Sequence, residues 1–289
     1  MELLSPKVDF VFKRIFGTEE NKDILVSFLN AVFEDSGQPL VADVEILDPF
    51  LHKDTLLDKE SVLDVKARTE SGMLIDVEVQ LWNRQDIEKR TLYYWAKLFE
   101  SQLSEGHGYW ELHKAVTINV VDFNCIPTEE YHSTFHLRED RTGILFSDLA
   151  EIHFVELRKL KEQSVGLERR LVRWMLFFMA KSREQLEALA EMDPAIKKAK
   201  TTLEFLSQDE EARRLYEQRL KWKMTYEAEI HGAKAEGREE GRKEGREEGE
   251  RQAKQEVATR LLRMGLTVDQ VAEGTGLSRQ EVADILKEI

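Results

Sequence analysis

The sequence predicts an α/β fold in which strands alternate with helices in the first half and helices fill the second half. Apolar and polar residues swap places on both sides of a polar turn in residues 61–82, which is typical of a β-hairpin. Apolar residues recur at helical spacing in residues 6–33 and 86–103, on either side of that hairpin. The β-branched run AVTINVVDF at residues 115–123 indicates a strand covered on both faces.

Two helices and a strand are expected before the hairpin. Residues 6–16 carry apolar side chains at helical spacing, and Gly17 supplies a stop. Thr18 is expected to be the N-cap of a second helix at residues 19–33, which has an apolar stripe. Residues 41–51 alternate and predict a strand. Through the β-branched run, the expected order is therefore helix, strand, strand, strand, helix, strand.

The hairpin is expected to turn at residues 69–72 and to carry charge on one face of each strand, because strand side chains alternate between faces. The apolar faces carry Leu63, Val65 and Ala67, then Ile75, Val77, Val79 and Leu81. The polar faces carry Asp64, Lys66 and Arg68, then Asp76, Glu78 and Gln80. Carboxylates, an amide and a lysine are groups that hold a hard divalent cation and position a water beside it. The alternative is a half-exposed hairpin whose polar face is solvated.

A helix at residues 86–103 is expected to follow the hairpin, with two further strands at 131–138 and 153–157. In the helix at residues 86–103, spacing assigns the core stripe to Leu92, Trp95, Ala96, Phe99 and Leu103, and the flanks to Arg90, Tyr93, Tyr94 and Lys97. Residues 167–230 have a helical pattern in which Pro194 marks a break or a helix start. A dense apolar patch at residues 174–179 is interpreted as core or as a homodimer face.

Glycine recurs every four residues at Gly237, Gly241, Gly245 and Gly249, beside parallel tracks of Glu and Arg. Tracks in register predict a helix where the segment is ordered. Each interior glycine costs about 1 kcal/mol relative to alanine, and no apolar stripe compensates, so a flexible charged linker is one interpretation. The other is a pair of helices that the glycine track allows to approach closely.

The last segment, residues 257–289, predicts three short helices arranged like a helix-turn-helix. Gly265 is expected to end the first, while Thr267 and Ser278 are expected to cap the second and third. The acidic residues of the third helix would face phosphates unfavourably. We therefore favour a protein-contact module over a DNA reader.

Composition narrows the class of protein. Hydrophobic residues make up 42% of the 289 residues, which indicates a globular chain, and the single Cys125 excludes a disulfide framework or a cysteine zinc cluster. Neither a long apolar run nor a signal peptide is present, so we expect a soluble, cytoplasmic protein with no membrane partner. The net charge of -14 argues against broad nonspecific binding to nucleic acid, so DNA contact would need a local basic surface.

Several ordered motifs of the first half resemble a known family. KVDFVFKRIFGTEENKDILVSFLNAVF, LDVKART, DVEVQ and RTLYYWAKLFESQLSEG, followed by TINVVDF, together resemble the Rpn family of recombination-promoting nucleases and putative transposases, within the PD-(D/E)XK nuclease superfamily. The resemblance is close over about residues 4–125 and looser through the helical region to about residue 230. It implies a PD-(D/E)XK nuclease-like αβββαβ core with a mixed sheet, in agreement with the element order above. A helical region and a small helix-turn-helix-like segment then follow this core.

Four parts of the chain are therefore expected. They are a nuclease-like core at 1–160, a helical extension at 161–231, a Gly/Glu/Arg-rich helical linker at 232–256, and a small helical module at 257–289.

The resemblance also implies a metal site. Asp64 and Glu78 match the acidic positions of the superfamily motif and would ligate Mg²⁺, with Mn²⁺ or Ca²⁺ as other candidate ions. The backbone carbonyl of Val79 would join them. Asp9, in the amino-terminal family motif, would add a further catalytic carboxylate or serve as a capping or surface acid.

Gln80 stands where the superfamily has lysine, although glutamine is usual in this family. An amide orients a water but supplies no positive charge to a phosphoryl transition state. Lys66, two residues from Asp64 on the same strand, is therefore a candidate for the missing cation.

The implied function is that of a metal-dependent DNA endonuclease that hydrolyses phosphodiester bonds, acting in recombination, mobile-element biology or defence. DNA is the expected partner, together with a second copy of the chain through the helical region and the glycine-rich helix. One alternative is an interaction protein that kept the nuclease fold with weak or no catalysis, which the net charge and Gln80 favour. The other is a DNA-binding regulator acting through the C-terminal helices.

Overall fold

The computed structural model describes residues 3–51, 61–83, 85–162 and 165–289. The chain divides into two compact units, Met1–Arg219 and Leu220–Ile289. Each unit has an apolar cluster of its own. The predicted strands and the expected metal site all lie in the first unit.

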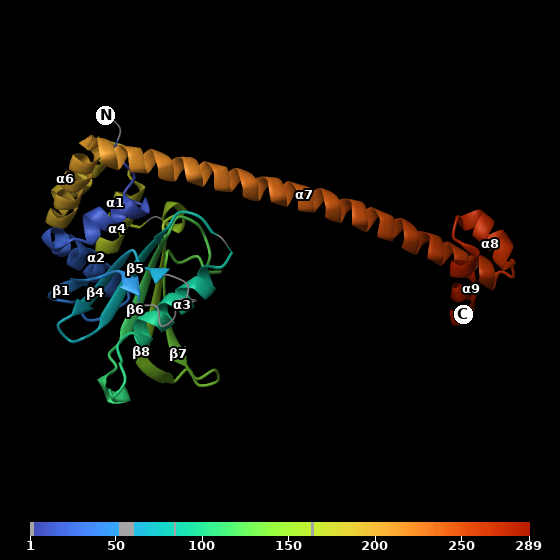
Figure 1. Cartoon of the computed structure of the whole chain (residues 1–289), viewed down its shortest axis with the longest axis horizontal. Coiled ribbons are helices and arrows are strands. Elements are labelled where there is room, and N and C mark those ends of the chain that lie inside the picture. The colour runs from blue at the N-terminus through green and yellow to red at the C-terminus, as the bar shows by residue number, and fades with distance from the viewer. Residues whose placement is uncertain (1–2, 52–60, 84, 163–164) are drawn as a thin grey trace. The chain divides into compact units, whose positions relative to one another are not determined.

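A six-stranded mixed sheet, in the order β1-β4-β5-β6-β8-β7, forms the centre of the first unit (Figure 1). The strands are β1 Val44–Leu47, β4 Val65–Thr69, β5 Leu74–Gln80, β6 Ala115–Val121, β7 His132–Arg138 and β8 Leu145–Glu156. Neighbours β5, β6 and β8 are parallel, and the other pairs are antiparallel. A parallel step needs a crossover, which α3 (Ile87–Glu100) makes between β5 and β6. The predicted αβββαβ order is therefore confirmed.

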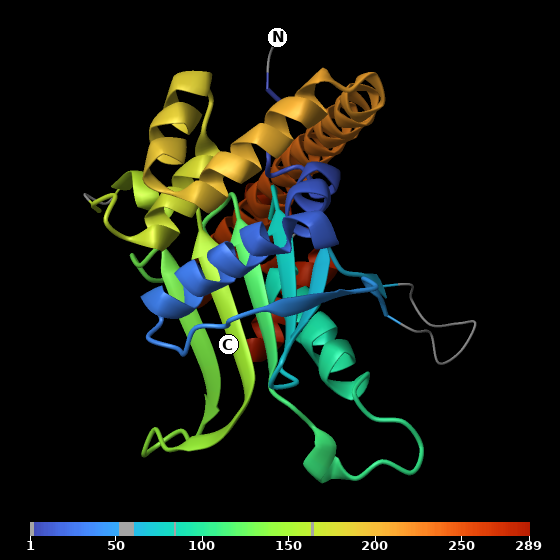
Figure 2. The same cartoon turned by 90° about the vertical axis from the view of Figure 1, so that its left-hand side faces the viewer.

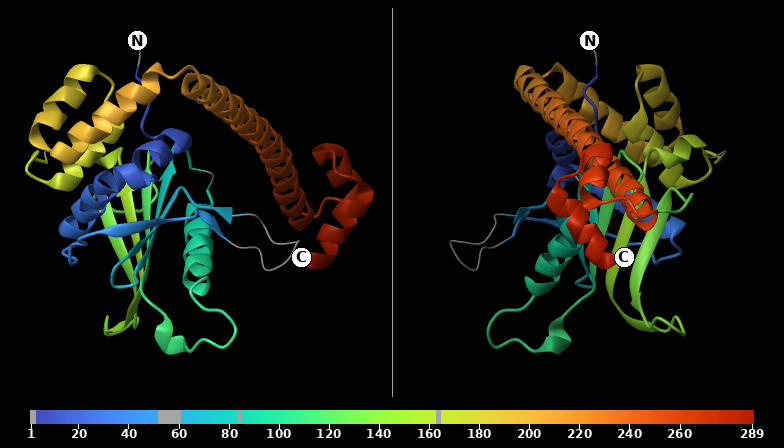
Figure 3. Two further views of the ribbon diagram at one scale, coloured as in Figure 1. Left: turned by 60° about the vertical axis from the view of Figure 1, so that its left-hand side comes forward. Right: turned by 90° about the vertical axis from the view of Figure 1, so that its right-hand side faces the viewer.

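Helices cover both faces of this sheet, so the first unit has three layers. The blue helix α2 lies across the strands in Figure 2, and α3 lies on the opposite side of the sheet in the left view of Figure 3. The helices that share the main core with the sheet are α1 Asp9–Phe16, α2 Lys22–Asp35, α4 Arg170–Met179, α5 Arg183–Met192 and α6 Pro194–Gln208. Alternate residues of β4, β5 and β6 pack into that core, which leaves the other face of the strands to α3.

The apolar patch at residues 174–179 belongs to this core. Trp174, Phe177 and Phe178 are at most 1% exposed, and Trp174 and Phe178 pack against Phe16 and Phe28 with ring centroids 5.5–6.0 Å apart. The first of the two interpretations is therefore confirmed. Because Trp174, Phe177 and Phe178 are already buried within one chain, these three side chains do not supply the homodimer face expected through the helical region.

Three element boundaries differ from the sequence prediction. Thr18 makes no capping bond to α2, because Glu19–Asn21 form a short 3-10 helix first, and Glu19 accepts a hydrogen bond from the main-chain NH of Ile46. The strand expected at 41–51 divides into β1 and a short β2 (Phe50–Leu51), which pairs with β3 (Ser61–Val62). Strand β8 begins at Leu145, well before residue 153, because it continues as a hairpin partner of β7.

A single long helix, α7 (Glu210–Arg263), begins in the first unit and continues into the second. Its glycine track is helical and exposed, which confirms the helix prediction for that segment. Two short helices follow, α8 Val268–Thr275 and α9 Arg279–Glu288, so the first of the three predicted short helices is instead the C-terminal end of α7. Thr267 and Ser278 form the predicted N-caps, each within a capping box. In the described part of the chain, none of the helices combines the length and the apolarity that crossing a membrane requires.

Candidate active site

The hairpin of β4 and β5 positions the acidic residues of the site. Its turn closes where the sequence predicts, since the NH of Gly72 donates to the carbonyl of Thr69 at 3.0 Å. Gly72 has a φ of 86°, a conformation that favours glycine. This turn sets a register in which Val65 pairs with Val77 and Lys66 pairs with Asp76.

The chain bends at Asp64, between β3 and β4. Leu63 packs beneath α3 with Leu74 and Leu98, whereas Val65 packs into the main core on the other face of the sheet. The prediction that Leu63 and Val65 share a face is therefore wrong, because regular alternation does not continue through the bend. The bend directs Asp64 toward the end of β5 rather than along a regular strand face.

Asp64 and Glu78 are held together across this bend by hydrogen bonds between their carboxylates and the main chain. The NH of Val79 donates to Asp64 Oδ2 at 3.0 Å, and the NH of Asp64 donates to Glu78 Oε1 at 3.0 Å. Glu78 is 2% exposed, and the Asp64 side chain is 11% exposed. The structure thus brings the two acids of the predicted motif together at the end of the hairpin away from its turn, where β4 begins and β5 ends.

Two cations that the sequence did not single out contact these acids. Lys13 Nζ, from α1, lies 3.3 Å from Asp64 Oδ1, and Arg90 Nη2, from α3, lies 2.9 Å from Glu78 Oε2. Gln80 Nε2 donates to the same Glu78 oxygen at 3.3 Å. Gly17 lets α1 end close to β4, because an added Cβ would lie 3.2 Å from a Val65 methyl group and 2.9 Å from the Lys13 carbonyl.

Arg90 reaches Glu78 because α3 is rotated from the expected orientation. Thr91 and Leu98 are buried, whereas Leu92, expected in the core stripe, is 56% exposed. Arg90 and Tyr94 lie one turn apart, with the guanidinium 4.9 Å from the ring centre. A second stripe of apolar and polar residues, at positions 87, 91, 94 and 98, was the sequence signal for the observed orientation of α3. This face turns inward because the acids of the sheet lie beneath the helix and attract Arg90.

The other candidate residues lie around this pair. Lys66 is opposite Asp76, one row of the sheet away from Asp64 and Glu78. Asp9, on α1 one turn before Lys13, pairs with Arg219 at 3.1 Å and also accepts a hydrogen bond from the NH of Phe10. The structure therefore places Lys13, rather than Asp9, in direct contact with Asp64.

Burial makes this group of carboxyls hard to ionise without a cation. Burial and the Asp64 charge raise the pKa of Glu78 to about 8, against the opposing effect of Arg90. Burial also raises the pKa of Asp64, with Lys13 opposing it. The pKa of Asp76 is raised well above its ordinary value by burial and by the charges of Glu78 and Asp64.

A family model described as PD-(D/E)XK nuclease family transposase matches residues 6–233. The chain belongs to this family. No curated protein and no solved structure gives a match. The matched span holds the whole sheet, both acids and both contacting cations, and the mixed six-stranded sheet agrees with a PD-(D/E)XK nuclease-like fold. Membership supports a nuclease or transposase-like function with DNA as substrate.

PD-(D/E)XK nucleases generally use divalent metal ions, and the donor set of this chain fits such an ion. Within the residues described, no three His, Cys, Asp or Glu side chains gather closely enough to hold a metal by themselves. A main-chain oxygen is available, however, because the NH and C=O of one strand residue point the same way, and the Val79 NH points at Asp64. Two buried carboxylates beside a further unpartnered acid, Asp76, give the excess negative charge and hard oxygen donors that Mg²⁺ requires.

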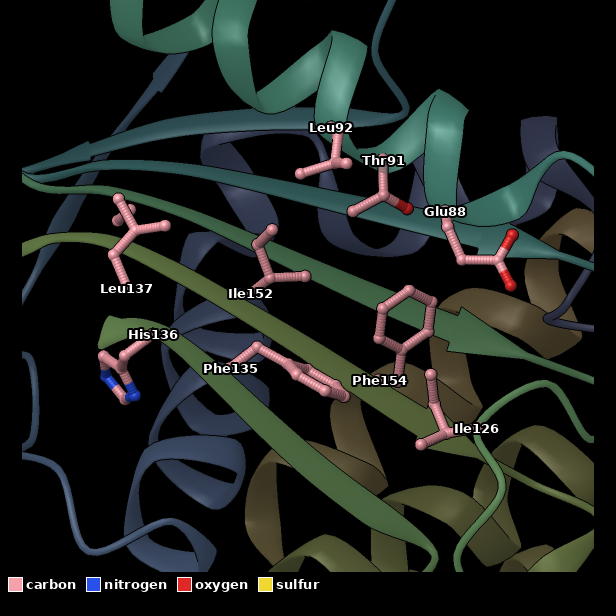
Figure 4. A pocket seen from close by; sticks show the side chains of 10 residues that line it. Glu88, Thr91, Leu92, Ile126, Phe135, His136, Leu137, Ile152 and Phe154 are labelled. Carbon is pink, nitrogen blue, oxygen red and sulfur yellow. The ribbon is translucent and has the colours of Figure 1, made fainter. Parts of the chain in front are cut away.

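An apolar cavity of about 270 Å³ lies on the same face of the sheet, between α3 and strands β7 and β8 (Figure 4). The rings of Phe135 and Phe154 meet edge to face in its wall, and Glu88 lies at one end. Asn119 separates it from the acids, since Asn119 pairs with Glu78 on one side and with Phe154 on the other. Its aromatic and aliphatic lining provides no set of metal ligands, so the cavity is distinct from the carboxylate site.

Proposed function

We propose that this member of the family is a Mg²⁺-dependent DNA endonuclease that hydrolyses phosphodiester bonds. One observation carries the proposal: the nearly buried Asp64, at the bend before β4, and the buried Glu78, on β5, each accept a main-chain hydrogen bond from the other's segment and lie beside the Val79 carbonyl. Such a site binds a hard cation through oxygen atoms that the fold has already positioned.

Asp64, Glu78 and the Val79 carbonyl would hold the ion. When bound, a divalent ion lowers the pKa of a water and neutralises charge on the scissile phosphate. The two acids keep fixed orientations because each also accepts a main-chain hydrogen bond. Mn²⁺ would support the same chemistry, and Ca²⁺ is the useful comparison because it accepts more ligands and a looser geometry.

Two cations that contact the acids would supply the positive charge that Gln80 lacks, and a third lies nearby. The Arg90 and Lys13 side chains are 31% and 34% exposed, so each touches an acid and keeps part of its surface open to a phosphate. The planar guanidinium of Arg90 presents several donors, which suits it to hold Glu78 and a phosphate together. Lys66, half-buried beside Asp76, remains the third candidate. Gln80 holds the Glu78 oxygen that Arg90 also contacts.

These cations form the local basic surface that an acidic chain needs to approach DNA. The third helix of the C-terminal module favours a protein contact over a second DNA contact, because both of its basic side chains pair with acids. Arg279 pairs with Asp269 at 2.9 Å, and Lys287 pairs with Asp284 at 2.7 Å. DNA contact is therefore proposed for the sheet unit alone.

Plasmid cleavage tests this function directly. Wild-type protein should nick or linearise plasmid with Mg²⁺ or Mn²⁺ and remain inactive in EDTA. Asp64→Ala and Glu78→Ala should each reduce cleavage on the order of 100-fold or more, since each removes transition-state stabilisation through the ion. Glu45→Gln is a matched control, because Glu45 is an exposed acid on the neighbouring strand β1.

Cleavage that persists equally in Asp64→Ala and Glu78→Ala would remove the proposed site. Wild-type protein that fails to cleave in any of the metals would instead favour an interaction protein that retains the nuclease fold.

A further inference from the structure

Asp76 is a buried carboxylate for which the protein provides no partner. It is 0% exposed, and neither of its oxygens accepts a hydrogen bond from the described chain. It lies on β5 two residues before Glu78, so both side chains are on the face of the sheet that α3 covers. An unpartnered polar group in such a place is strongly unfavourable, and native structures satisfy nearly all of them with protein or ordered water.

Other buried acids of this chain show that the fold can satisfy a carboxylate. Glu151 is also 0% exposed, yet it contacts Lys114, His136 and His153, each at 2.7 Å. Glu156 pairs with Lys159 and accepts a hydrogen bond from the NH of Cys125. Asp76 differs from both, and the difference points to a partner from outside the chain.

A second unpartnered group lies next to Asp76. Thr117, its neighbour on β6, is 0% exposed, and its hydroxyl has no hydrogen-bond partner in the described residues. On the other side, Lys66 of β4 faces Asp76, but no ion pair joins them within the described chain. Carboxylate and hydroxyl therefore form a small polar site beneath α3, beside Glu78.

We propose that Asp76 and Thr117 bind the water shell of the divalent ion held at Asp64 and Glu78, and thereby select Mg²⁺. This inference rests on the proposed metal site and assigns it an additional pair of residues. Mg²⁺ gives up its waters reluctantly and keeps several of them in protein sites, so it needs acceptors placed beyond its direct ligands. Replacing groups that lie just beyond the direct ligands typically costs about 10- to 100-fold in metal affinity or activity.

The spacing of Asp76 and Glu78 suits contact through water. Two residues along a strand lie roughly 7 Å apart. A Mg²⁺–water bond of about 2.1 Å and a short water–carboxylate hydrogen bond of about 2.7 Å together span nearly 5 Å. Direct ligation by all three acids would need a closer convergence than these residues have, since no three of them form a metal-binding group among the described side chains. One water between the ion and Asp76 suits this spacing, and Thr117 lies beside Asp76 on the neighbouring strand.

Calorimetric titration of the full chain with Mg²⁺ alone and with Ca²⁺ alone tests the proposal. Asp76→Asn should bind Mg²⁺ about 10- to 100-fold more weakly than wild type, with a smaller loss for Ca²⁺, which takes more ligands directly from protein. In EDTA, the same variant should melt at a higher temperature than wild type, because it no longer buries an uncompensated acid. If Asp76 had only a structural role, replacing it would change neither the metal affinity nor the preference for Mg²⁺ over Ca²⁺.

Glu151→Gln is the matched control, because Glu151 is equally buried but lies on the opposite face of the sheet with its partners in place. It should melt at a lower temperature and bind Mg²⁺ like wild type. An unchanged Mg²⁺ affinity in Asp76→Asn would overturn the inference, as would an equal loss in Glu151→Gln. If wild type bound neither ion, the proposed function would fail together with the inference, whereas binding unaffected by Asp76→Asn would overturn the inference alone.

Discussion

Raising the pH of the metal-free protein from 6.5 to 7.5 is expected to lower its stability, because Glu78 must lose a proton inside a buried site. Burial and the charge of Asp64 raise its pKa from 4.5 to about 8. Throughout this interval the carboxyl is ionised in the unfolded chain but mostly protonated in the folded one. The folded state therefore binds more protons, and the free energy of unfolding falls as the pH rises.

The size of the expected stability change follows from the one proton that Glu78 binds in the folded state. A difference of one bound proton changes the free energy of unfolding by about 1.4 kcal/mol per pH unit. For a unit of this size, 1 kcal/mol corresponds to roughly 2–4 °C in Tm, so Glu78 alone should lower Tm by roughly 3–6 °C between pH 6.5 and 7.5. The raised pKa of Asp64 acts in the same direction. Burial lowers the pKa of His153, which acts in the opposite direction, but below pH 6.5.

Thermal unfolding followed by circular dichroism in EDTA at the two pH values measures this effect. Glu78→Gln should show a smaller difference in Tm, because an amide does not titrate. Excess Mg²⁺ should remove or reverse the difference in wild type, since the ion binds the ionised carboxylate. A wild-type Tm that stays constant or rises in EDTA would show that Glu78 does not destabilise the metal-free fold on ionising, and so would a Glu78→Gln protein that keeps the full wild-type difference.

Three further predictions concern Arg90, Lys66 and the glycine-rich helix. Arg90→Ala should lower Mg²⁺-dependent cleavage on the order of 100-fold while tightening Mg²⁺ binding, because Arg90 competes with the ion for Glu78. Lys66→Ala should lower cleavage without abolishing Mg²⁺ binding. Unchanged cleavage in Lys66→Ala would remove that lysine from the mechanism. If the glycine track pairs two helices, a peptide spanning residues 233–255 should give a helical circular dichroism signal and a dimer mass in sedimentation at high concentration. A coil signal with a monomer mass would contradict close pairing through the glycine track.

The long-range contacts of the site had little signal in the sequence. Lys13 could be placed on a helix with Asp9, but no periodicity indicates that this helix ends against β4 and brings Lys13 to Asp64. The orientation of α3 likewise depends on a distant segment of the chain. Its most apolar stripe was the obvious core face, yet acids on the sheet favour a face that carries Arg90 and Tyr94. Both outcomes depend on what lies opposite a helix, which its own residues do not report.

Local features, by contrast, follow from local rules. The turn at Gly72, the N-caps at Thr267 and Ser278, and the helix start at Pro194 each depend on the conformational limits or hydrogen bonds of a few adjacent residues. The order of helices and strands along the chain follows from alternation and β-branched composition in the same way. These are the parts of the fold that are predictable without a tertiary structure.

Turn chemistry and alternation act over a few residues, so the amino-acid sequence is enough to predict that the two acids belong to one β-hairpin region of an α/β core. Only the tertiary structure decided that the chain bends at Asp64, that α3 buries Glu78 and Asp76 instead of leaving them solvated, and that Lys13 and Arg90 contact the pair. Those outcomes result from packing between segments distant in the chain, where burial and charge of the opposing surface select the orientation. The unpartnered state of Asp76 belongs to the same group, since burial without a partner exists only once α3 has closed over the sheet.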